Sequence, residues 1–332
     1  MFISVAGRYS ASRNANADLP LAVGPAMSAT FRGLSDDSMF TATLIAAQNF
    51  DAGDISTAAE RVAATGAQVL AARWVEANKA LDVDFTGDAA AVRAAVEGAF
   101  PSTDAIVQQT AHRARTLIVA DMDSTMITIE CIDELADYAG IKPQIAEVTE
   151  RAMRGELDFE SALRSRVALL EGLPEAVIAQ CLAERVVIMP GAKELVRTIR
   201  AHGGHAVLVS GGFTRFAEPV AAEIGFNQAI ANVLGIKDGV LTGSVEGEIV
   251  GAATKKQVLE QTCAVKGLVA AESLAVGDGA NDIPMIEAAG LGVAYHAKPK
   301  TAAAAPARID HGDLTAILYA MGYPRAAWAT LD

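Results

Sequence analysis

Four side chains that could do chemistry, Asp121, Asp123, Ser124 and Thr125, directly follow the largely apolar segment 116–120. Such a run is typical of a parallel strand covered on both faces, and ligands bind beyond the carboxyl ends of these strands. Residues two apart on an extended segment point the same way, so Asp121 and Asp123 can address one site. Because close carboxylates repel each other, the pair needs a divalent cation or a shared proton that raises one pKa. An acidic turn or helix cap is the alternative interpretation.

Two further apolar segments also end in residues that could bind anions or metals. These residues are Ser210 and Gly211 after 207–209, Asp278, Asn281 and Asp282 after 274–276, and between them Lys255 at the start of an amphipathic run. A serine hydroxyl and a glycine N–H can approach phosphoryl oxygens, and a lysine at a helix start adds positive charge. The two aspartates offer hard oxygen ligands that suit magnesium. Singly these features are typical of loops, turns and a solvated charge, but their joint order predicts an anion site beside a metal site.

At these motifs the chain resembles the haloacid dehalogenase superfamily of aspartate-nucleophile phosphotransferases. The resemblance runs from about Thr116 to the C-terminus, and it rests on DMDST at 121–125, ECIDEL at 130–135, FESALRSRV at 159–167, VSGGF at 209–213 and GDGAND at 277–282. The first and last motifs are typical of the superfamily. The segments that begin at Glu130 and Phe159 are typical of its branch that acts on phosphoserine.

The resemblance implies a division of labour between the two leading aspartates. Asp121 would attack the phosphoryl group and form an aspartyl-phosphate, while Asp123 would protonate the departing serine hydroxyl and then activate water. Mg²⁺ would lie between the Asp121 carboxylate, the Asp123 main-chain carbonyl and the Asp278 carboxylate, with Asp282 supporting the metal site through water. Thr125 would lie beside this site, or its hydroxyl would cap the following helix.

The same resemblance implies two groups of substrate-binding residues. They are Ser210, Gly211, Lys255 and Asn281 around the phosphoryl group, and Glu130, Met153, Phe159 and Arg166 around the amino acid. Glu130 would pair with the substrate ammonium, and the planar Arg166 guanidinium with its carboxylate. Met153 and Phe159 would close over the substrate and exclude water. The alternatives are an exposed helical charge for Arg166 and core packing for Met153 and Phe159.

The predicted fold class is α/β, a doubly wound, Rossmann-like core with a helical cap insertion, preceded by a small α+β domain that resembles ACT domains. The predicted domains are 1–38, a disordered leader after which Met39 is an alternative start; 39–110, the α+β domain; and 111–332, the catalytic domain with its cap at about 126–189. The α+β domain is expected to regulate the enzyme or form a homodimer, or alternatively to serve as a packing module without a ligand.

Composition excludes several classes of protein. A formal charge of −13 disfavours nucleic acids and acidic membranes as partners, and no apolar run reaches membrane-spanning length. Three cysteines, Cys131, Cys181 and Cys263, lack metal-ligand spacing and indicate reduced thiols in the cytoplasm. The function that the resemblance implies is magnesium-dependent hydrolysis of O-phospho-L-serine, the last step of serine biosynthesis. The alternatives are phosphoryl transfer to a small hydroxyl acceptor such as homoserine, and a serine-sensing regulatory protein.

Overall fold

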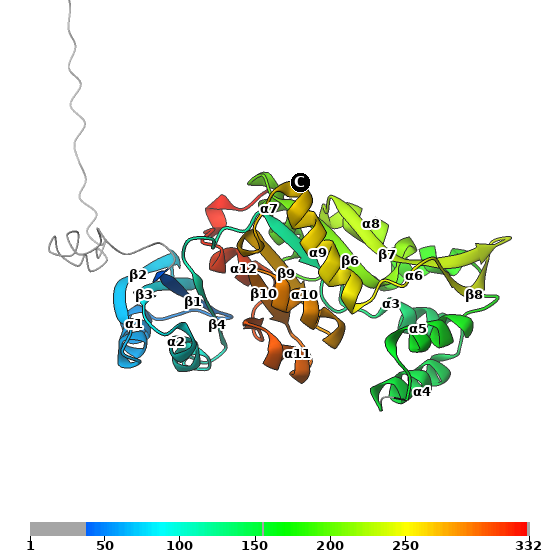
Figure 1. The fold of residues 1–332 in the computed structure, drawn as a ribbon, viewed down its shortest axis with the longest axis horizontal. Helices are drawn as coiled ribbons and strands as arrows, with labels where there is room; N and C mark the ends of the chain where they lie inside the picture. The colour runs from blue at the N-terminus through cyan, green and yellow to red at the C-terminus, as the bar shows by residue number, and fades with distance from the viewer. Residues whose placement is uncertain (1–37, 155, 331–332) are drawn as a thin grey trace, which may run out of the picture. The chain divides into compact units, whose positions relative to one another are not determined.

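A computed structural model of the protein describes residues 38–154 and 156–330, apart from the side chain of Met153. The leader predicted at 1–38 lies outside the described residues except for Ser38, so its disorder stays a prediction. The described chain forms two β-sheets, and a group of helices is inserted after the first strand of the second sheet (Figure 1).

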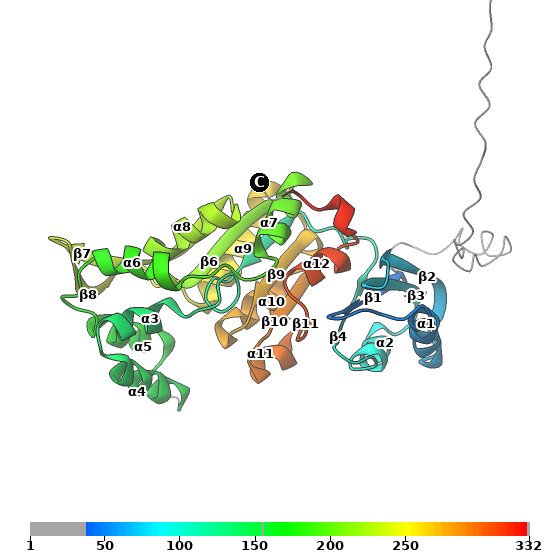
Figure 2. The ribbon, with the colours of Figure 1, turned by 180° about the vertical axis from the view of Figure 1, so that it is seen from behind.

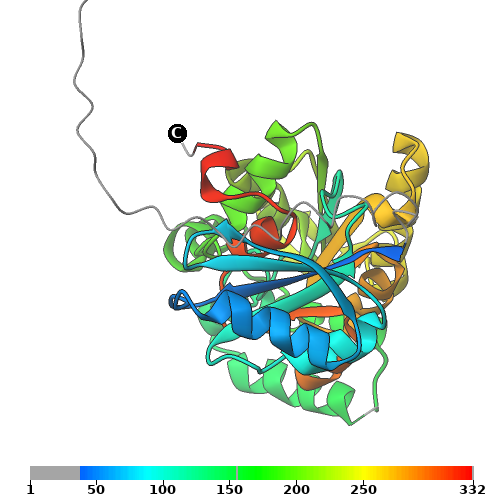
Figure 3. The ribbon, with the colours of Figure 1, turned by 90° about the vertical axis from the view of Figure 1, so that its left-hand side faces the viewer.

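The first sheet belongs to the segment 39–110. Its elements are β1 (Phe40–Ala46), α1 (Asp54–Ala64), β2 (Gln68–Glu76), β3 (Ala80–Thr86), α2 (Ala89–Val96) and β4 (Thr103–Gln109). The strands are antiparallel in the order β2-β3-β1-β4, and this β-α-β-β-α-β sequence of elements is that of ferredoxin-like folds. Alternate strand residues such as Leu44, Val83 and Phe85 pack with α1 and α2 on one face (Figure 3). The predicted α+β elements are therefore confirmed, and the ACT-like assignment stays a prediction.

The opposite face of this sheet packs against the catalytic part of the chain. The Asp104 carboxylate accepts hydrogen bonds from the backbone N–H groups of residues 310, 311 and 312 at 2.8, 3.1 and 2.7 Å. The Gln108 side-chain amide donates to the carbonyl of Ala320 at 2.8 Å, and Ile106 joins the large hydrophobic core of the catalytic part. Polar and apolar contacts therefore both hold the two sheets together.

The second sheet has seven strands in the order β11-β10-β9-β5-β6-β7-β8. They are β5 (Leu117–Ala120), β6 (His205–Phe213), β7 (Gln228–Lys237), β8 (Val240–Glu246), β9 (Ser273–Gly277), β10 (Leu291–Tyr295) and β11 (Ala307–Ile309). All neighbours are parallel except β7 and β8, which form a hairpin with left-handed Asp238 and Gly239 at its turn. The sequence predicts a β-hairpin over Val233–Glu248, because Lys237, Asp238 and Gly239 stand between apolar residues. In the structure β7 begins earlier and also pairs with β6, so the hairpin extends the sheet.

Helices cover both faces of this sheet (Figure 2). They are α7 (Ala192–Ala201), α8 (Thr214–Ile224) and α12 (Thr315–Ala320) on one face, α9 (Ala252–Lys266) and α10 (Ile283–Ala288) on the other, and α11 (Pro299–Ala304) after β10; short 3-10 turns are η3 (Ala270–Glu272), η4 (Ala280–Asp282) and η5 (Arg325–Ala327). Ile118 of β5 faces the first group, and its neighbours Leu117 and Val119 face the second. Both faces of β5 are thus buried, which explains its unbroken apolar run and confirms the doubly wound core.

The insertion between β5 and α7 is helical, as predicted. Its helices are α3 (Cys131–Tyr138), α4 (Lys142–Met153), α5 (Phe159–Ala168) and α6 (Ala176–Arg185). An isolated antiparallel bridge between Ile127 and Ile188 joins its two ends. Ile132 and Leu135 of α3 are buried, and Gly140, with φ of +69°, follows the end of this helix. No helix of the described residues is both long and apolar enough to cross a membrane.

Candidate active site

The site lies where the carboxyl ends of β5, β9 and β6 meet the inserted helices. A cavity of about 490 Å³ opens there. Its lining includes nine of the residues predicted from the sequence, namely Asp121, Asp123, Glu130, Phe159, Arg166, Ser210, Gly211, Asp278 and Asn281. Parallel strands bring these distant segments to one edge of the sheet, so the cavity follows from the topology of the fold.

Asp121 ends the central strand and is almost fully buried. Its Oδ1 atom accepts a hydrogen bond from the backbone N–H of Met122 at 2.8 Å and lies 2.7 Å from Nζ of Lys255. Burial, followed by repulsion from Asp282, raises the pKa of Asp121 well above its ordinary value, and Lys255 opposes this rise. A second positive charge near Asp121 would therefore favour the ionised carboxylate that a nucleophile requires.

Lys255 lies in the first turn of α9 and is completely buried. Its ammonium group is 2.7 Å from Oδ1 of Asp121 and 2.7 Å from Oδ1 of Asp282. Burial disfavours the charge, but the two carboxylates outweigh it and hold the pKa of Lys255 above its ordinary value. The interpretation of Lys255 as a solvated surface charge is wrong. It joins Asp121 to Asp282, and its contact with a phosphoryl group stays a prediction.

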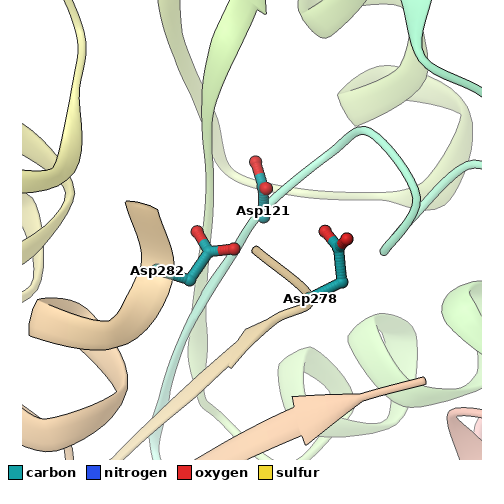
Figure 4. Close-up of side chains that lie close together, drawn as sticks. All are labelled: Asp121, Asp278 and Asp282. Atoms are coloured by element: carbon teal, nitrogen blue, oxygen red, sulfur yellow. The ribbon is translucent and has the colours of Figure 1, made fainter. Parts of the chain in front are cut away.

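Three buried carboxylates form a candidate metal site. One oxygen from each of Asp121, Asp278 and Asp282 can be chosen so that all lie within 4.8 Å of one another. Figure 4 shows the three side chains converging from the ends of β5 and β9 and from η4. Burial is the largest cause that raises the pKa of Asp278, to which Thr125 donates a hydrogen bond at 3.3 Å. This excess of negative charge, made of hard oxygen donors, fits a divalent cation such as Mg²⁺.

The cluster differs in one member from the set inferred from the sequence. Asp282, which is predicted to act on the metal through water, also lies in this cluster, and its Oδ1 atom is 2.7 Å from Nζ of Lys255. Oxygens within 4.8 Å of one another suit both direct and water-mediated binding, so the role of Asp282 stays a prediction. Oδ2 of Asp282 also accepts a hydrogen bond from the backbone N–H of Gly279 at 3.0 Å, which fixes its orientation. The role expected for Asp123 uses its main-chain carbonyl, which a cluster of side chains does not test.

Asp123 faces the same cavity as Asp121 but has a different environment. Burial and then repulsion by Glu130 raise its pKa to about 7. Within the described part of the chain, its Oδ1 atom is buried without a hydrogen-bond partner. A Cβ atom at Gly212 would come within 3.1 Å of Oδ2 of Asp123, so a glycine keeps this approach open. A carboxyl group with a pKa near neutral can both give and take a proton.

The predicted anion-binding segment is a bulge at the end of β6. In the pairing with β7, Val209 lies opposite Ile230 and Phe213 opposite Asn232, so three residues of β6 face one residue of β7. The Ser210 hydroxyl accepts a hydrogen bond from the backbone N–H of Gly212 at 2.9 Å. The bulge thus takes Ser210, Gly211 and Gly212 out of the ladder, and all three residues line the cavity.

The inserted helices contribute two opposite charges to the cavity. Glu130, which precedes α3, accepts a hydrogen bond from the Ser124 hydroxyl at 2.9 Å. Arg166 of α5 is half-buried, and burial is the main cause that lowers its pKa. Among the described residues Arg166 makes no ion pair within 4.0 Å, and its Nε atom donates to the carbonyl of Ala162 at 3.4 Å. The interpretation of Arg166 as an exposed helical charge is wrong.

Phe159 crosses from the inserted helices to the sheet. Its ring lies 3.3 Å from a Cβ position at Gly211 and 3.4 Å from one at Gly251, and the side chain keeps 39% exposure. Core packing is therefore the wrong interpretation of Phe159, which forms a wall of the cavity. Met153 ends α4, but its side chain lies outside the described residues, so its predicted role stays a prediction.

Sequence reasoning missed two residues that shape the site, Lys298 and Asn232, and it named Ser124 without foreseeing its contact with Glu130. Lys298 places Nζ 3.7 Å from Oδ2 of Asp278. Ser124, with φ of +55°, orients Glu130, and Asn232 binds the backbone of two site segments. Ser124 belongs to the DMDST motif at 121–125, so the sequence does contain a signal for this residue. Lys298 and Asn232 lie in segments whose residue types are typical of a surface and of a strand.

Comparison with known proteins finds a matching family model and similar phosphatases. A family model described as haloacid dehalogenase-like hydrolase matches residues 118–287. A phosphoserine phosphatase of Albidiferax ferrireducens is 47% identical over 207 residues, which cover 61% of this chain and 87% of that protein. A phosphoserine phosphatase of Haemophilus influenzae is 46% identical over 202 residues, which cover 61% of this chain and 64% of that protein.

One similar solved structure reaches beyond the catalytic part of the chain. It is a probable phosphoserine phosphatase from Vibrio cholerae in its unliganded form, with a TM-score of 0.69 and 34% identity. The likeness covers 90% of this chain and 94% of that one. Residues 111–332 alone could not supply this share, so the similarity extends into the N-terminal sheet.

Proposed function

The chain belongs to the haloacid dehalogenase-like hydrolases, and within this family we propose that it hydrolyses O-phospho-L-serine to L-serine and inorganic phosphate. The observation that carries the proposal is the charge arrangement of one cavity. Asp121 and the Ser210–Gly211 bulge lie on its sheet side, and Glu130 and Arg166 line the same cavity from the inserted segment. A phosphorylated amino acid has three charged groups that match these three places.

The donor set fits a bound Mg²⁺ ion. The Asp121 and Asp278 carboxylates and the Asp123 main-chain carbonyl would hold it, and Asp282 lies close enough to share in this. When bound, the ion would neutralise the charge that otherwise repels an anionic substrate from an anionic nucleophile. Lys255 balances only part of the negative charge, because it pairs with Asp121 and Asp282 and leaves Asp278 to the exposed Lys298.

The chain's own side chains then divide the reaction into two steps. An Asp121 carboxylate oxygen attacks phosphorus, the bond from phosphorus to the serine oxygen breaks, and the Asp123 carboxyl gives its proton to that oxygen. In the second step Asp123 takes a proton from water as the water attacks the aspartyl-phosphate, which releases phosphate and restores Asp121. The pKa of about 7 suits Asp123 to both roles.

Recognition of the amino acid would come from the inserted segment. Glu130, oriented by Ser124, would accept the ammonium group, and the Arg166 guanidinium would bind the carboxylate. The Phe159 ring spans from α5 to Gly211, so it would shield the phosphoryl group from bulk water. The similarity to phosphoserine phosphatases supports this substrate. The reaction releases L-serine, so it would be the last step of serine biosynthesis.

The N-terminal domain would be ACT-like, as its order of elements suggests. In that role it would sense an amino acid or join two copies of the chain. Its extensive packing on the catalytic part offers a route for such regulation. Serine inhibition and mass in solution, measured with and without residues 1–101, test these two roles separately.

Phosphate release by the full chain tests the proposal. After treatment with EDTA, the protein should release phosphate from phosphoserine only when Mg²⁺ is restored, and faster than from phosphothreonine or sugar phosphates. Asp121→Asn is the matched control, because the amide is nearly isosteric but a poor nucleophile. Added homoserine distinguishes transfer from hydrolysis, since a transferase would form phosphohomoserine. The proposal fails if phosphoserine is not hydrolysed with Mg²⁺ or if Asp121→Asn keeps its activity.

A further inference from the structure

Asn232 is a buried polar residue that the reaction scheme does not use. It lies in β7 with 1% of its surface exposed, next to the bulge of β6. A buried amide needs partners for both its oxygen and its nitrogen, because an unpaired polar group in a core costs about 1–3 kcal/mol. The two ends of the Asn232 amide find these partners on two different segments of the active site.

The nitrogen of the amide binds the anion-binding bulge. Nδ2 of Asn232 donates to the carbonyl of Gly211 at 2.8 Å. The bulge takes Ser210–Gly212 out of the regular β6–β7 ladder, so backbone groups there lose their strand partners. The Asn232 side chain replaces one of these lost partners. Consequently, the carbonyl of Gly211 is held toward β7.

The oxygen of the same amide binds the segment that begins α9. Oδ1 of Asn232 accepts a hydrogen bond from the backbone N–H of Val250 at 2.8 Å. Gly251 follows as the residue that precedes the helix, and its carbonyl accepts the backbone N–H of Lys255 at 3.0 Å. Lys255 in turn lies 2.7 Å from Asp121. The position of Val250 therefore sets where the buried ammonium meets the nucleophile.

We propose that Asn232 is a positioning residue of the reaction, which joins the Ser210–Gly211 bulge to the first turn of α9 so that the phosphoryl-binding groups and Lys255 face Asp121 together. The proposal rests on the function proposed above. It adds a residue outside the cavity that acts through Gly211 and Val250. The Phe159 ring lies against both Gly211 and Gly251, so the same link also supports the wall of the cavity.

The strand pair contains a matched control at its other end. Oδ1 of Asn227 accepts a hydrogen bond from the backbone N–H of Ala206 at 2.9 Å. This contact also joins the β6 and β7 segments through an asparagine, but at the amino ends of the strands and away from the cavity. Asn227→Ala therefore removes the same kind of bond without touching the phosphoryl-binding groups.

The test measures phosphate binding and amino-acid binding separately. We expect Asn232→Ala to weaken inhibition by inorganic phosphate and to lower kcat/KM about 10- to 100-fold, since small misplacements of catalytic groups have effects of this order. Inhibition by L-serine should be unchanged, because Glu130 and Arg166 lie on the inserted segment. Asn227→Ala should lower Tm without changing either inhibition constant. Asn232→Ser is the second variant if the alanine variant does not fold.

Two outcomes would overturn the inference. One is a folded Asn232 variant whose phosphate inhibition and kcat/KM equal those of the unmodified protein. The other is an equal loss of phosphate and serine binding in both asparagine variants, in proportion to Tm, which would mark a general effect on stability. Hydrolysis of p-nitrophenyl phosphate provides an arm that does not need phosphoserine. If the unmodified protein hydrolyses p-nitrophenyl phosphate but not phosphoserine, the proposed substrate is wrong. The role of Asn232 can then still be measured with p-nitrophenyl phosphate.

Discussion

Replacing Asp123 by asparagine should stabilise the metal-free protein above neutral pH while it reduces turnover about 10²–10⁴-fold. Burial and Glu130 raise the pKa of Asp123 from 3.8 to about 7. Well below pH 3.8 this carboxyl is protonated in both the folded and the unfolded chain and has little effect on stability. As the pH rises toward 7, the unfolded chain loses this proton first, so folding becomes less favourable. Above pH 7 the full penalty is present, and Asp123→Asn removes it.

The size of this penalty follows from the pKa difference. About three pKa units at about 1.36 kcal/mol each give an upper value of about 4 kcal/mol. The Asp123 side chain is only partly buried in an open cavity, and water screens part of the effect, so about 2 kcal/mol is the expected gain. In a chain of this size the gain corresponds to about 4 °C in Tm.

Thermal unfolding in EDTA between pH 5.5 and 9 measures this effect. The lower limit keeps the protein above its sequence pI of about 4.9, where it carries a net negative charge. The Tm of Asp123→Asn minus that of the unmodified protein should grow up to about pH 7 and then level off. Asp158→Ala is the control of opposite sign. The backbone N–H of Ser161 lowers the pKa of Asp158, so this carboxylate stabilises the fold throughout the range and its loss should lower Tm at every pH. A difference for Asp123→Asn that stays constant or shrinks with pH would refute the reasoning.

Three further predictions concern other charged residues, three of them in the active site and one, Asp104, between the two sheets. Lys255→Met should abolish turnover and lower the free energy of unfolding in EDTA by about 3–5 kcal/mol. Added Mg²⁺ should restore part of the lost Tm, and an equal loss of Tm with and without Mg²⁺ would contradict the pairing of Lys255 with Asp121. Arg166→Ala and Glu130→Gln should impair phosphoserine turnover far more than that of p-nitrophenyl phosphate, and equal losses would remove both residues from substrate recognition. Asp104→Ala should lower the free energy of unfolding in urea by about 3 kcal/mol, because three backbone N–H groups lose a charged acceptor, and a change within error would show that this contact between the sheets is weak.

The catalytic fold could be predicted from the sequence because its signals are local. The apolar run before Asp121 indicates a strand buried on both faces, and the spacing of Ile132 and Leu135 indicates a helix with one buried face. For the segment 39–110 the sequence predicts an α+β domain, and the structure has four strands and two helices there. The pairing of β7 with β6 was missed, because a strand pattern in the sequence does not tell how many partners the strand has.

The site was predictable where a motif carries the chemistry, and unpredictable where a side chain acts on the backbone of another segment. Asp121, Asp278 and Asp282 come from two motifs, and their convergence follows from the order of the parallel strands. The contacts of Asn232 depend on a bulge in the neighbouring strand, and nothing in the local sequence of β7 announces it. Similarly, the bond from Asp104 to residues 310–312 joins positions too distant in the chain for any periodicity to reveal.

The balance of charge explains why the groups assigned to the phosphoryl oxygens at the bulge are neutral. Lys255 pairs with Asp121 and Asp282, and the further positive charge that this carboxylate cluster calls for would come from a cation held among Asp121, Asp278 and Asp282 rather than at the bulge. A neutral serine hydroxyl and backbone N–H groups at Ser210–Gly212 would therefore be enough to hold the phosphoryl oxygens. Neutral donors depend on direction more than a full charge does, so hydrogen bonds of defined geometry must set their orientation. The buried amide of Asn232 would meet this requirement, and the position of the Gly211 carbonyl would then be a condition of activity.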